Sequence, residues 1–130
     1  YKLRVVRLAA RQPLPGAIPI VYLAGGPGGS GVGTARGPRW PIFDRMREHH
    51  DVLLFDQRGT GLSDVPPPCP YPASLAMAEL ASARQEAQAT ARKCVEEWRR
   101  QGIDLDSYTT LESAADLKVL QQAYGSAQIQ

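Results

Sequence analysis

A run of glycines after an apolar segment is the part of this sequence best suited to chemistry. Residues 24–31 are Ala-Gly-Gly-Pro-Gly-Gly-Ser-Gly, and they directly follow the apolar run Ile-Pro-Ile-Val-Tyr-Leu at 18–23. Glycine permits positive φ and lets another group come close to the main-chain N–H groups. Unpaired N–H groups at the end of a strand bind phosphate, carboxylate or a developing oxyanion. The sequence therefore predicts an anion-binding loop. Its anion could be a mononucleotide phosphate, the pyrophosphate of a dinucleotide, or an oxyanion that forms during a reaction.

A mononucleotide phosphate is the first candidate. The phosphate-loop pattern G-x-x-x-x-G-K-[ST] needs a lysine directly after its second glycine. Gly28 and Gly33 have the required spacing, but Thr34 follows Gly33 and no lysine stands there. The sequence therefore disfavours a phosphate loop of this type.

A dinucleotide is the second candidate. Gly26, Gly28 and Gly31 match G-x-G-x-x-G, and Asp56 follows the next apolar run, where an acid could bind a ribose. The pattern requires a helix that begins inside it, and we expect residues 31–38, rich in glycine and ending in proline, not to begin one. Pro27 also lacks an N–H donor. A dinucleotide-binding oxidoreductase therefore stays an alternative, although these two features disfavour it.

The third candidate is an oxyanion, and it rests on three segments in order. Residues 23–31 resemble the HGGPG loop of the prolyl-aminopeptidase branch of the α/β-hydrolases, with Ala24 in place of the histidine, as in secreted tripeptidyl-aminopeptidase-like members. Residues 56–63, Asp-Gln-Arg-Gly-Thr-Gly-Leu-Ser, resemble the D-x-R-G-x-G-x-S turn of the same branch. Residues 108–110 with 114–117 resemble the helix before its nucleophile. The ordered set, which extends over most of the chain, resembles the N-terminal part of such a hydrolase.

The resemblance implies roles for the glycine loop and for the turn at 56–63. In this family one N–H of the loop and one N–H after the nucleophile hold the tetrahedral oxyanion. Gly26 is our first choice for the loop donor, and Gly25 and Gly28 are the second choices. Six residues are expected to support the two loops without reacting: Pro27, Asp56, Arg58, Gly59, Gly61 and Ser63. We expect the Arg58 guanidinium to bind carbonyls and carboxylates.

No catalytic residue is expected within residues 1–130. The nucleophile motif G-x-S-x-G fails at Val32 after Ser30 and at Val65 after Ser63. His49 and His50, the only histidines, lie between a predicted helix and a predicted strand, on the sheet edge opposite the glycine loop. In this fold the order is serine, acid, histidine, so the resemblance places all three beyond Gln130. This chain alone is expected to be inactive, and its expected partner is the C-terminal part of the hydrolase, in the same polypeptide or in another chain.

The implied activity is that of an aminopeptidase-like serine hydrolase: acyl transfer from a peptide N-terminus or an ester to water through an acyl-serine, without metal or organic cofactor. An ester hydrolase of the same fold and a non-catalytic binding module are kept as alternatives. The net charge of +2 gives no indication of a nucleic-acid surface, and no apolar run reaches the length of a membrane span.

The expected fold is α/β, with a mostly parallel sheet and helices on both faces, and it is incomplete in this chain. Hydrophobic patterns predict strands at 2–8, 18–23 and 51–56, the second buried on both faces, and the start of another strand at 128–130. Helices are predicted at 40–49, at about 74–100, and from a capping box at Thr109 and Glu112 to Gly125. Residues 1–130 are expected to form one part of a hydrolase domain, with a loop-helix insertion at about 66–107.

Cys69 and Cys94 are the only cysteines. Cys69 lies in the proline-rich segment 66–72, which has no other evident anchor, and either two reduced thiols or a disulfide fits the sequence. Similar secreted hydrolases carry a cysteine pair in this insertion, and this resemblance favours the disulfide. A disulfide implies an oxidising compartment, so a secreted or periplasmic location is expected.

Overall fold

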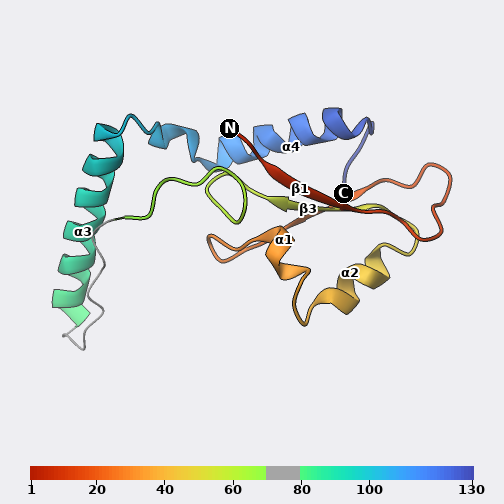
Figure 1. Ribbon diagram of the computed structural model, residues 1–130, viewed down its shortest axis with the longest axis horizontal. Helices are drawn as coiled ribbons and strands as arrows, with labels where there is room; N and C mark the ends of the chain where they lie inside the picture. Colours follow the sequence, from red (N-terminus) through yellow and green to blue (C-terminus); the bar gives the residue numbers. More distant parts are fainter. Residues whose placement is uncertain (70–79) are drawn as a thin grey trace. The chain divides into compact units, whose positions relative to one another are not determined.

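The computed structural model describes residues 1–69 and 80–130 (Figure 1). These residues divide into two compact units, one of Tyr1–Val65 with Tyr108–Gln130 and one of Pro66–Ser107. The first unit holds the sheet, and the second holds one long helix.

A three-stranded mixed sheet forms the centre of the first unit. Its strands are β1 (Arg4–Leu8), β2 (Ile20–Leu23) and β3 (Val52–Asp56), in the order β1-β3-β2. β2 and β3 are parallel, as the strand–helix–strand order predicts, whereas β1 is antiparallel to β3. Helix α4 (Thr110–Tyr124) lies on one side of the sheet, and α1 (Gly31–Thr34) and α2 (Trp40–Met46) lie on the other (Figure 1). The predicted α/β fold with helices on both faces is confirmed for this unit.

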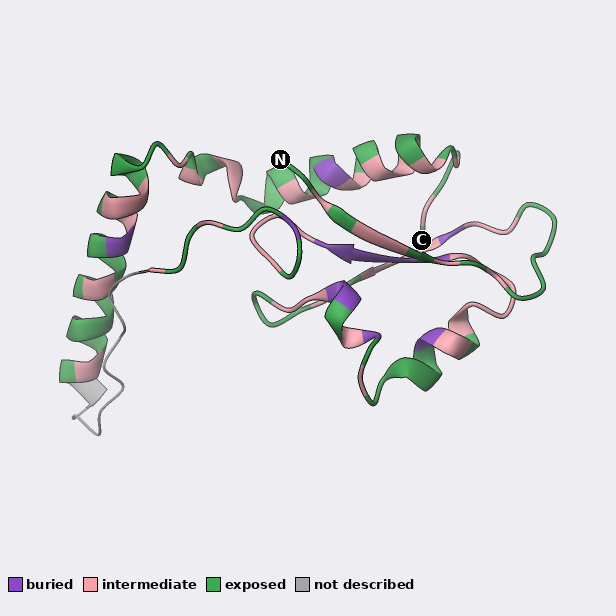
Figure 2. Cartoon of the chain, viewed as in Figure 1, coloured by how far each residue is buried: buried purple, intermediate pink, exposed green. Residues whose placement is uncertain are grey.

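The core is built around β3, which is buried along its whole length (Figure 2). The principal apolar cluster joins β3 to the segment of α1 and α2: Val32, Ala35, Phe43, Val52 and Leu54. The Tyr22 ring of β2 meets the Phe43 ring edge to face, with 4.8 Å between the centroids. The α2 helix therefore covers the sheet through Phe43, although it ends at Met46 and not at the predicted His49.

β2 is not buried on both faces, and this prediction is wrong. Its residues are half-buried, and Leu23 is 41% exposed. The reason is the strand order: β3 is the central strand of the three, and β2 is an edge strand. Beyond β2, Gln130 donates to the carbonyl of Pro19 at 3.0 Å and accepts from the N–H of Val21 at 2.7 Å. These two bonds have the pattern of a parallel strand pair, although residues 128–130 are not assigned as a strand.

A short helix begins inside the glycine-rich segment, so the prediction that none could begin there is also wrong. α1 has Ser30 as its N-cap, and the Ser30 hydroxyl accepts from the N–H of Gly33 at 2.7 Å. The N–H of Val32 donates to Oδ1 of Asp56 at 3.0 Å. Two of the donors at its N-terminus are thus paired, and this offsets the low helix propensity of glycine for a single turn.

Helix α4 has the predicted ends. The Thr109 hydroxyl accepts from the N–H of Glu112 at 3.3 Å, and Gly125 takes the left-handed conformation that stops the helix. At its C-terminal end, the Tyr124 hydroxyl donates to Oδ2 of Asp51.

The second unit consists of α3 (Leu80–Arg100), the 3₁₀ turn Leu105–Ser107 and the segment before the undescribed residues. The predicted helix start near Ser74 lies outside the described residues. Cys69 and Cys94 form a disulfide, with 5.4 Å between their Cα atoms. The Trp98 indole N–H donates to the carbonyl of Pro67 at 2.9 Å. The bridge and this hydrogen bond together fasten residues 67–69 to α3.

Candidate functional site

An open groove of about 550 Å³ lies beyond the C-terminal ends of β2 and β3, within the first unit. One wall is the glycine loop, residues 24–28. The turn after β3 contributes Gln57, Arg58 and Thr60. The segment that begins α4 contributes Tyr108, Thr109, Thr110 and Ser113. The groove therefore brings together all three segments that the sequence singled out.

The glycine loop presents unpaired main-chain donors to this groove. Within residues 1–69 and 80–130, no protein acceptor is hydrogen-bonded to the N–H of Gly25, Gly26 or Gly28. The loop closes on itself, because the N–H of Gly29 donates to the carbonyl of Gly25 at 3.2 Å. The peptide bond between Gly26 and Pro27 is cis. Such unpaired donors at the end of a strand suit a group that carries negative charge.

At two positions in the loop, a Cβ would lie too close to the backbone of the loop itself. Gly26 has a φ of 147°, and a Cβ there would lie 3.1 Å from the nitrogen of Gly29 and 3.3 Å from that of Gly28. A Cβ on Gly29 would collide with the Gly25 carbonyl. Gly29 was not singled out from the sequence, because the close approach depends on how the loop folds back.

Asp56 connects the glycine loop to the turn after β3. Its side chain is fully buried, and Oδ1 accepts from the Ser30 hydroxyl at 2.8 Å as well as from the N–H of Val32. Oδ2 accepts from the N–H of Leu62 at 2.9 Å. Burial works to raise the pKa of Asp56, but the hydrogen bonds from Leu62, Val32 and Ser30 outweigh it and hold the pKa below its ordinary value. This carboxylate is ionised at neutral pH and ties the two loops together.

The turn after β3 is held by its own contacts. The Ser63 hydroxyl donates to the carbonyl of Asp56 and accepts from the N–H of Arg4 at 2.8 Å. Gly61 has a φ of 55°, and a Cβ there would collide with the Asp56 carboxylate. Gly59 has a φ of 76°, and a Cβ there would lie 3.1 Å from the Tyr108 ring. Both glycines therefore stand where the backbone passes close to another group.

Arg58 joins the turn to α4 through a buried ion pair. Its Nε and Nη2 atoms each lie 2.7 Å from a carboxylate oxygen of Asp116, and the two side chains are 7% and 11% exposed. Nη1 lies 3.3 Å from the exposed carboxylate of Glu112. The guanidinium also stacks over the Tyr1 ring, 5.0 Å from its centroid. The bond to Asp116 stabilises the charged guanidinium and raises the pKa of Arg58 above its ordinary value.

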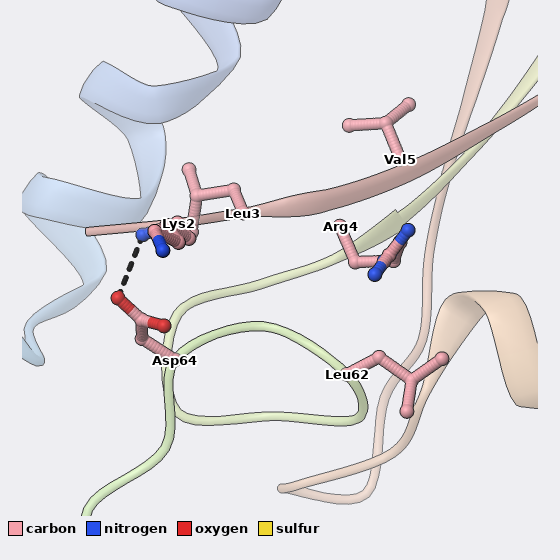
Figure 3. A pocket seen from close by; sticks show the side chains of 6 residues that line it. All are labelled: Lys2, Leu3, Arg4, Val5, Leu62 and Asp64. Atoms are coloured by element: carbon pink, nitrogen blue, oxygen red, sulfur yellow. Dashed lines mark hydrogen bonds between the residues drawn. The ribbon is translucent and has the colours of Figure 1, made fainter.

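A second cavity, of about 340 Å³, lies where the turn after β3 meets the start of β1 (Figure 3). The N–H of Lys2 donates to Oδ2 of Asp64 at 2.7 Å, and the N–H of Asp64 donates to the carbonyl of Lys2 at 2.9 Å. Its lining contains no serine, cysteine or histidine. These bonds fix the turn against β1 and so help to place Arg58.

The structure brings no nucleophile together with a base in its described part. The Ser30 and Ser63 hydroxyls are both engaged with Asp56, as described above. Nδ1 of His49 lies 3.0 Å from the carbonyl of Gln12, and Nδ1 of His50 lies 2.9 Å from the carbonyl of Ile18. Both histidines thus contact main chain that precedes β2, at the opposite end of that strand from the glycine loop.

The groove is also poorly suited to a dinucleotide. Asp56, the candidate ribose ligand, is fully buried and already accepts three hydrogen bonds. The N–H groups of Val32 and Gly33, at the start of α1, are paired with Asp56 and Ser30. A pyrophosphate would need those donors. In the described residues, no group of three or more histidine, cysteine or acidic side chains is placed to hold a metal ion.

The family of the chain follows from sequence comparison. A family model described as the alpha/beta hydrolase fold matches residues 18–129, and the chain belongs to this family. No curated protein and no solved structure gives a significant match. In the part of the chain that the structure describes, no helix is long and apolar enough to cross a membrane.

Ser30, Asp116 and Tyr108 are among the residues of the site that had no role assigned from the sequence. Ser30 could have been found as a helix N-cap if a helix had been expected after it. Asp116 lies in a segment whose resemblance to the hydrolases was noted, but nothing local connects it to Arg58, 58 residues earlier. Tyr108 is brought to the groove only by the return of the chain to the first unit.

Proposed function

We propose that this chain supplies the oxyanion loop of a serine hydrolase that acts on peptide N-termini. The observation that carries the proposal is the set of unpaired N–H groups at Gly25, Gly26 and Gly28, placed on a groove at the C-terminal end of β2. Donors of this kind stabilise a developing oxyanion, and loss of one typically lowers kcat by about 100- to 1,000-fold. Ala24 has no side-chain donor, so the backbone alone carries this role.

The nucleophile, the acid and the histidine belong, in this proposal, to a segment outside residues 1–130. The pairing of Gln130 beside β2 supports it, because a parallel strand there would run toward the same sheet edge as the glycine loop. A turn after such a strand would bring its own N–H next to the loop donors, so that both could bind one oxygen.

In this proposal the reacting group in the groove is the carbonyl of a peptide or an ester, which is uncharged until the nucleophile attacks it. The guanidinium of Arg58 is already paired with Asp116 and Glu112, and the other polar side chains of the wall are hydroxyls, an amide and a phenol. An ester hydrolase with the same loop is the second candidate. The disulfide supports a secreted or periplasmic location for the protein.

Probe labelling tests the class of enzyme. We expect a fluorophosphonate to label the full-length protein on a serine outside residues 1–130, and to leave a chain of residues 1–130 unlabelled. Labelling of Ser30 or Ser63, or no labelling of the full-length protein, would contradict the proposal and favour a binding module.

A loop variant tests the oxyanion role. Gly26→Ala in the full-length protein should lower kcat by about 100-fold with a smaller change in KM, because the new Cβ meets the nitrogens of Gly28 and Gly29. Gly37→Ala is the control, since its Cβ would meet only the Thr34 carbonyl, at 3.8 Å. Thermal melting of both variants must show that they are folded. Wild-type kcat in a folded Gly26→Ala variant would refute the role of the loop.

A further inference from the structure

We propose that Asp116 is a positioning residue of this site: by holding Arg58, it fixes the first turn of α4 as a wall of the groove that the glycine loop also lines. The inference rests on the proposed hydrolase function. Asp116 does not line the groove, whereas Arg58, Thr110 and Ser113 do. Its effect on the reaction therefore passes through the position of other groups.

The first observation is that the most buried side chain of α4 is polar and charged. Asp116 is the only buried residue of this helix. Leu111 is 82% exposed and Val119 is 61% exposed, so neither holds α4 against the sheet. The side-chain contacts that join α4 to the rest of the first unit include the Arg58–Asp116 pair near the middle of the helix and the bond from Tyr124 to Asp51 at its C-terminal end.

The second observation is the geometry of the ion pair. Two parallel bonds of 2.7 Å between the guanidinium and the carboxylate fix both distance and angle. A single point contact would leave the helix free to rotate about it. Since Asp116 lies one helical turn from Ser113 and two from Thr109, this pair sets where those hydroxyls lie in the groove.

The third observation is that Arg58 is rigidly connected to the glycine loop. The Gln57 amide donates to the carbonyl of Ala24 at 3.4 Å, and Asp56 binds both Ser30 and Leu62. The glycine loop and α4, which both line the groove, are thus both bonded to the turn after β3. A displacement of α4 changes the width of the groove, and misplacement of substrate by about 1 Å can cost up to 100-fold in rate.

The test compares a variant near the middle of α4 with one at its C-terminal end, in the full-length protein. Asp116→Asn removes one charge of the pair, and we expect kcat to fall about 10- to 100-fold. Tyr124→Phe removes the hydrogen bond at the far end, away from the groove, and we expect kcat within about twofold of wild type. Both are assayed at a temperature at which melting curves show them folded. A purely structural role of Asp116 would make the two variants alike.

Two outcomes overturn the proposal: Asp116→Asn with wild-type kcat and KM, or Tyr124→Phe with an equal loss of kcat. If Asp116→Asn does not fold, Arg58→Lys takes its place, because it keeps the charge and loses the paired geometry. Wild-type kcat in folded Arg58→Lys would then refute the inference.

If fluorophosphonate does not label the wild-type protein, the hydrolase proposal fails, but the positioning role of Asp116 can still be tested. NMR then shows whether the ion pair sets the position of the first turn of α4. Amide resonances of Thr110 and Ser113 should shift in Asp116→Asn (or Arg58→Lys) and stay in place in Tyr124→Phe. Unshifted resonances in the variants of the ion pair would refute the inference.

Discussion

The Ser30 hydroxyl donates a hydrogen bond of 2.8 Å to Oδ1 of Asp56, and the two residues come from the two loops that border the groove. Ser30 at the same time caps α1. Asp56 also holds the N–H of Leu62 on the far side of the turn. One buried carboxylate thus determines how the glycine loop and the turn after β3 lie relative to each other.

Asp56→Asn should strongly destabilise the protein. An amide can accept at only one of its two ends, so either the donors at Ser30 and Val32 or the donor at Leu62 lose their partner in a buried place. We expect a loss of about 2–4 kcal/mol in the free energy of unfolding, measured by urea denaturation. Asp64→Asn is the control, because Asp64 is exposed, and it should cost less than about 1 kcal/mol. Equal losses in the two variants would contradict this prediction.

The stability of the protein should fall in acid because of Asp56. Its folded-state pKa lies below the ordinary value of about 3.9 that the unfolded chain has, so the unfolded state binds more protons. The stabilisation is complete above that ordinary pKa and is lost as the pH falls through the folded-state pKa. We expect the urea midpoint to drop between pH 5 and about pH 2. The slope should be smaller in Asp56→Asn, and an unchanged slope would exclude Asp56 as a cause.

Asp51 should contribute a second part of the acid sensitivity. Burial works to raise the pKa of Asp51, but bonds from Tyr124, Ala10 and Arg7 outweigh it and hold the pKa below its ordinary value. Some slope should therefore persist in Asp56→Asn and should diminish when Tyr124→Phe is added. Full loss of the slope in Asp56→Asn alone would contradict a contribution from Asp51.

Gly61→Ala should cost more stability than Gly16→Ala, although both glycines have positive φ, 55° and 73°. An added Cβ at Gly16 meets nothing within 4 Å, so only the backbone conformation is penalised, by about 1 kcal/mol. At Gly61 the Cβ collides with the Asp56 carboxylate, and we expect about 3 kcal/mol. Urea denaturation of the two variants gives the comparison, and similar losses would show that the turn moves aside at no cost.

Removal of the disulfide should destabilise the second unit. Cys69 and Cys94 are 25 residues apart, and closure of a loop of that length is worth about 3 kcal/mol. The double variant Cys69→Ser with Cys94→Ala should lose helix signal from α3 at lower urea concentration. Intact-mass measurement after alkylation should find no free thiol in protein from an oxidising compartment, and two after reduction. Two alkylated thiols without reductant would refute the bridge in solution.

The sequence by itself determined most of the local structure. Alternating and continuous apolar runs predicted the three strands, and the order strand, helix, strand predicted the parallel pair of β2 and β3. The cap at Thr109 and the stop at Gly125 were predicted because both depend on residues within one turn of the helix end. The order of three motifs likewise indicated the hydrolase family to which the chain belongs.

Only the tertiary structure decided how these pieces meet. The central place of β3 leaves β2 half-buried, and strand order cannot be deduced from the hydrophobicity of one strand. α1 forms because one of its N-terminal donors, the N–H of Val32, is paired with Asp56, 24 residues away. Helix propensity describes only neighbouring residues and cannot predict this bond. Arg58 finds Asp116 in the same way, across 58 residues. Hydrogen bonds and ion pairs depend on distance in space. Only the folded chain brings the partners of these two contacts within reach of each other.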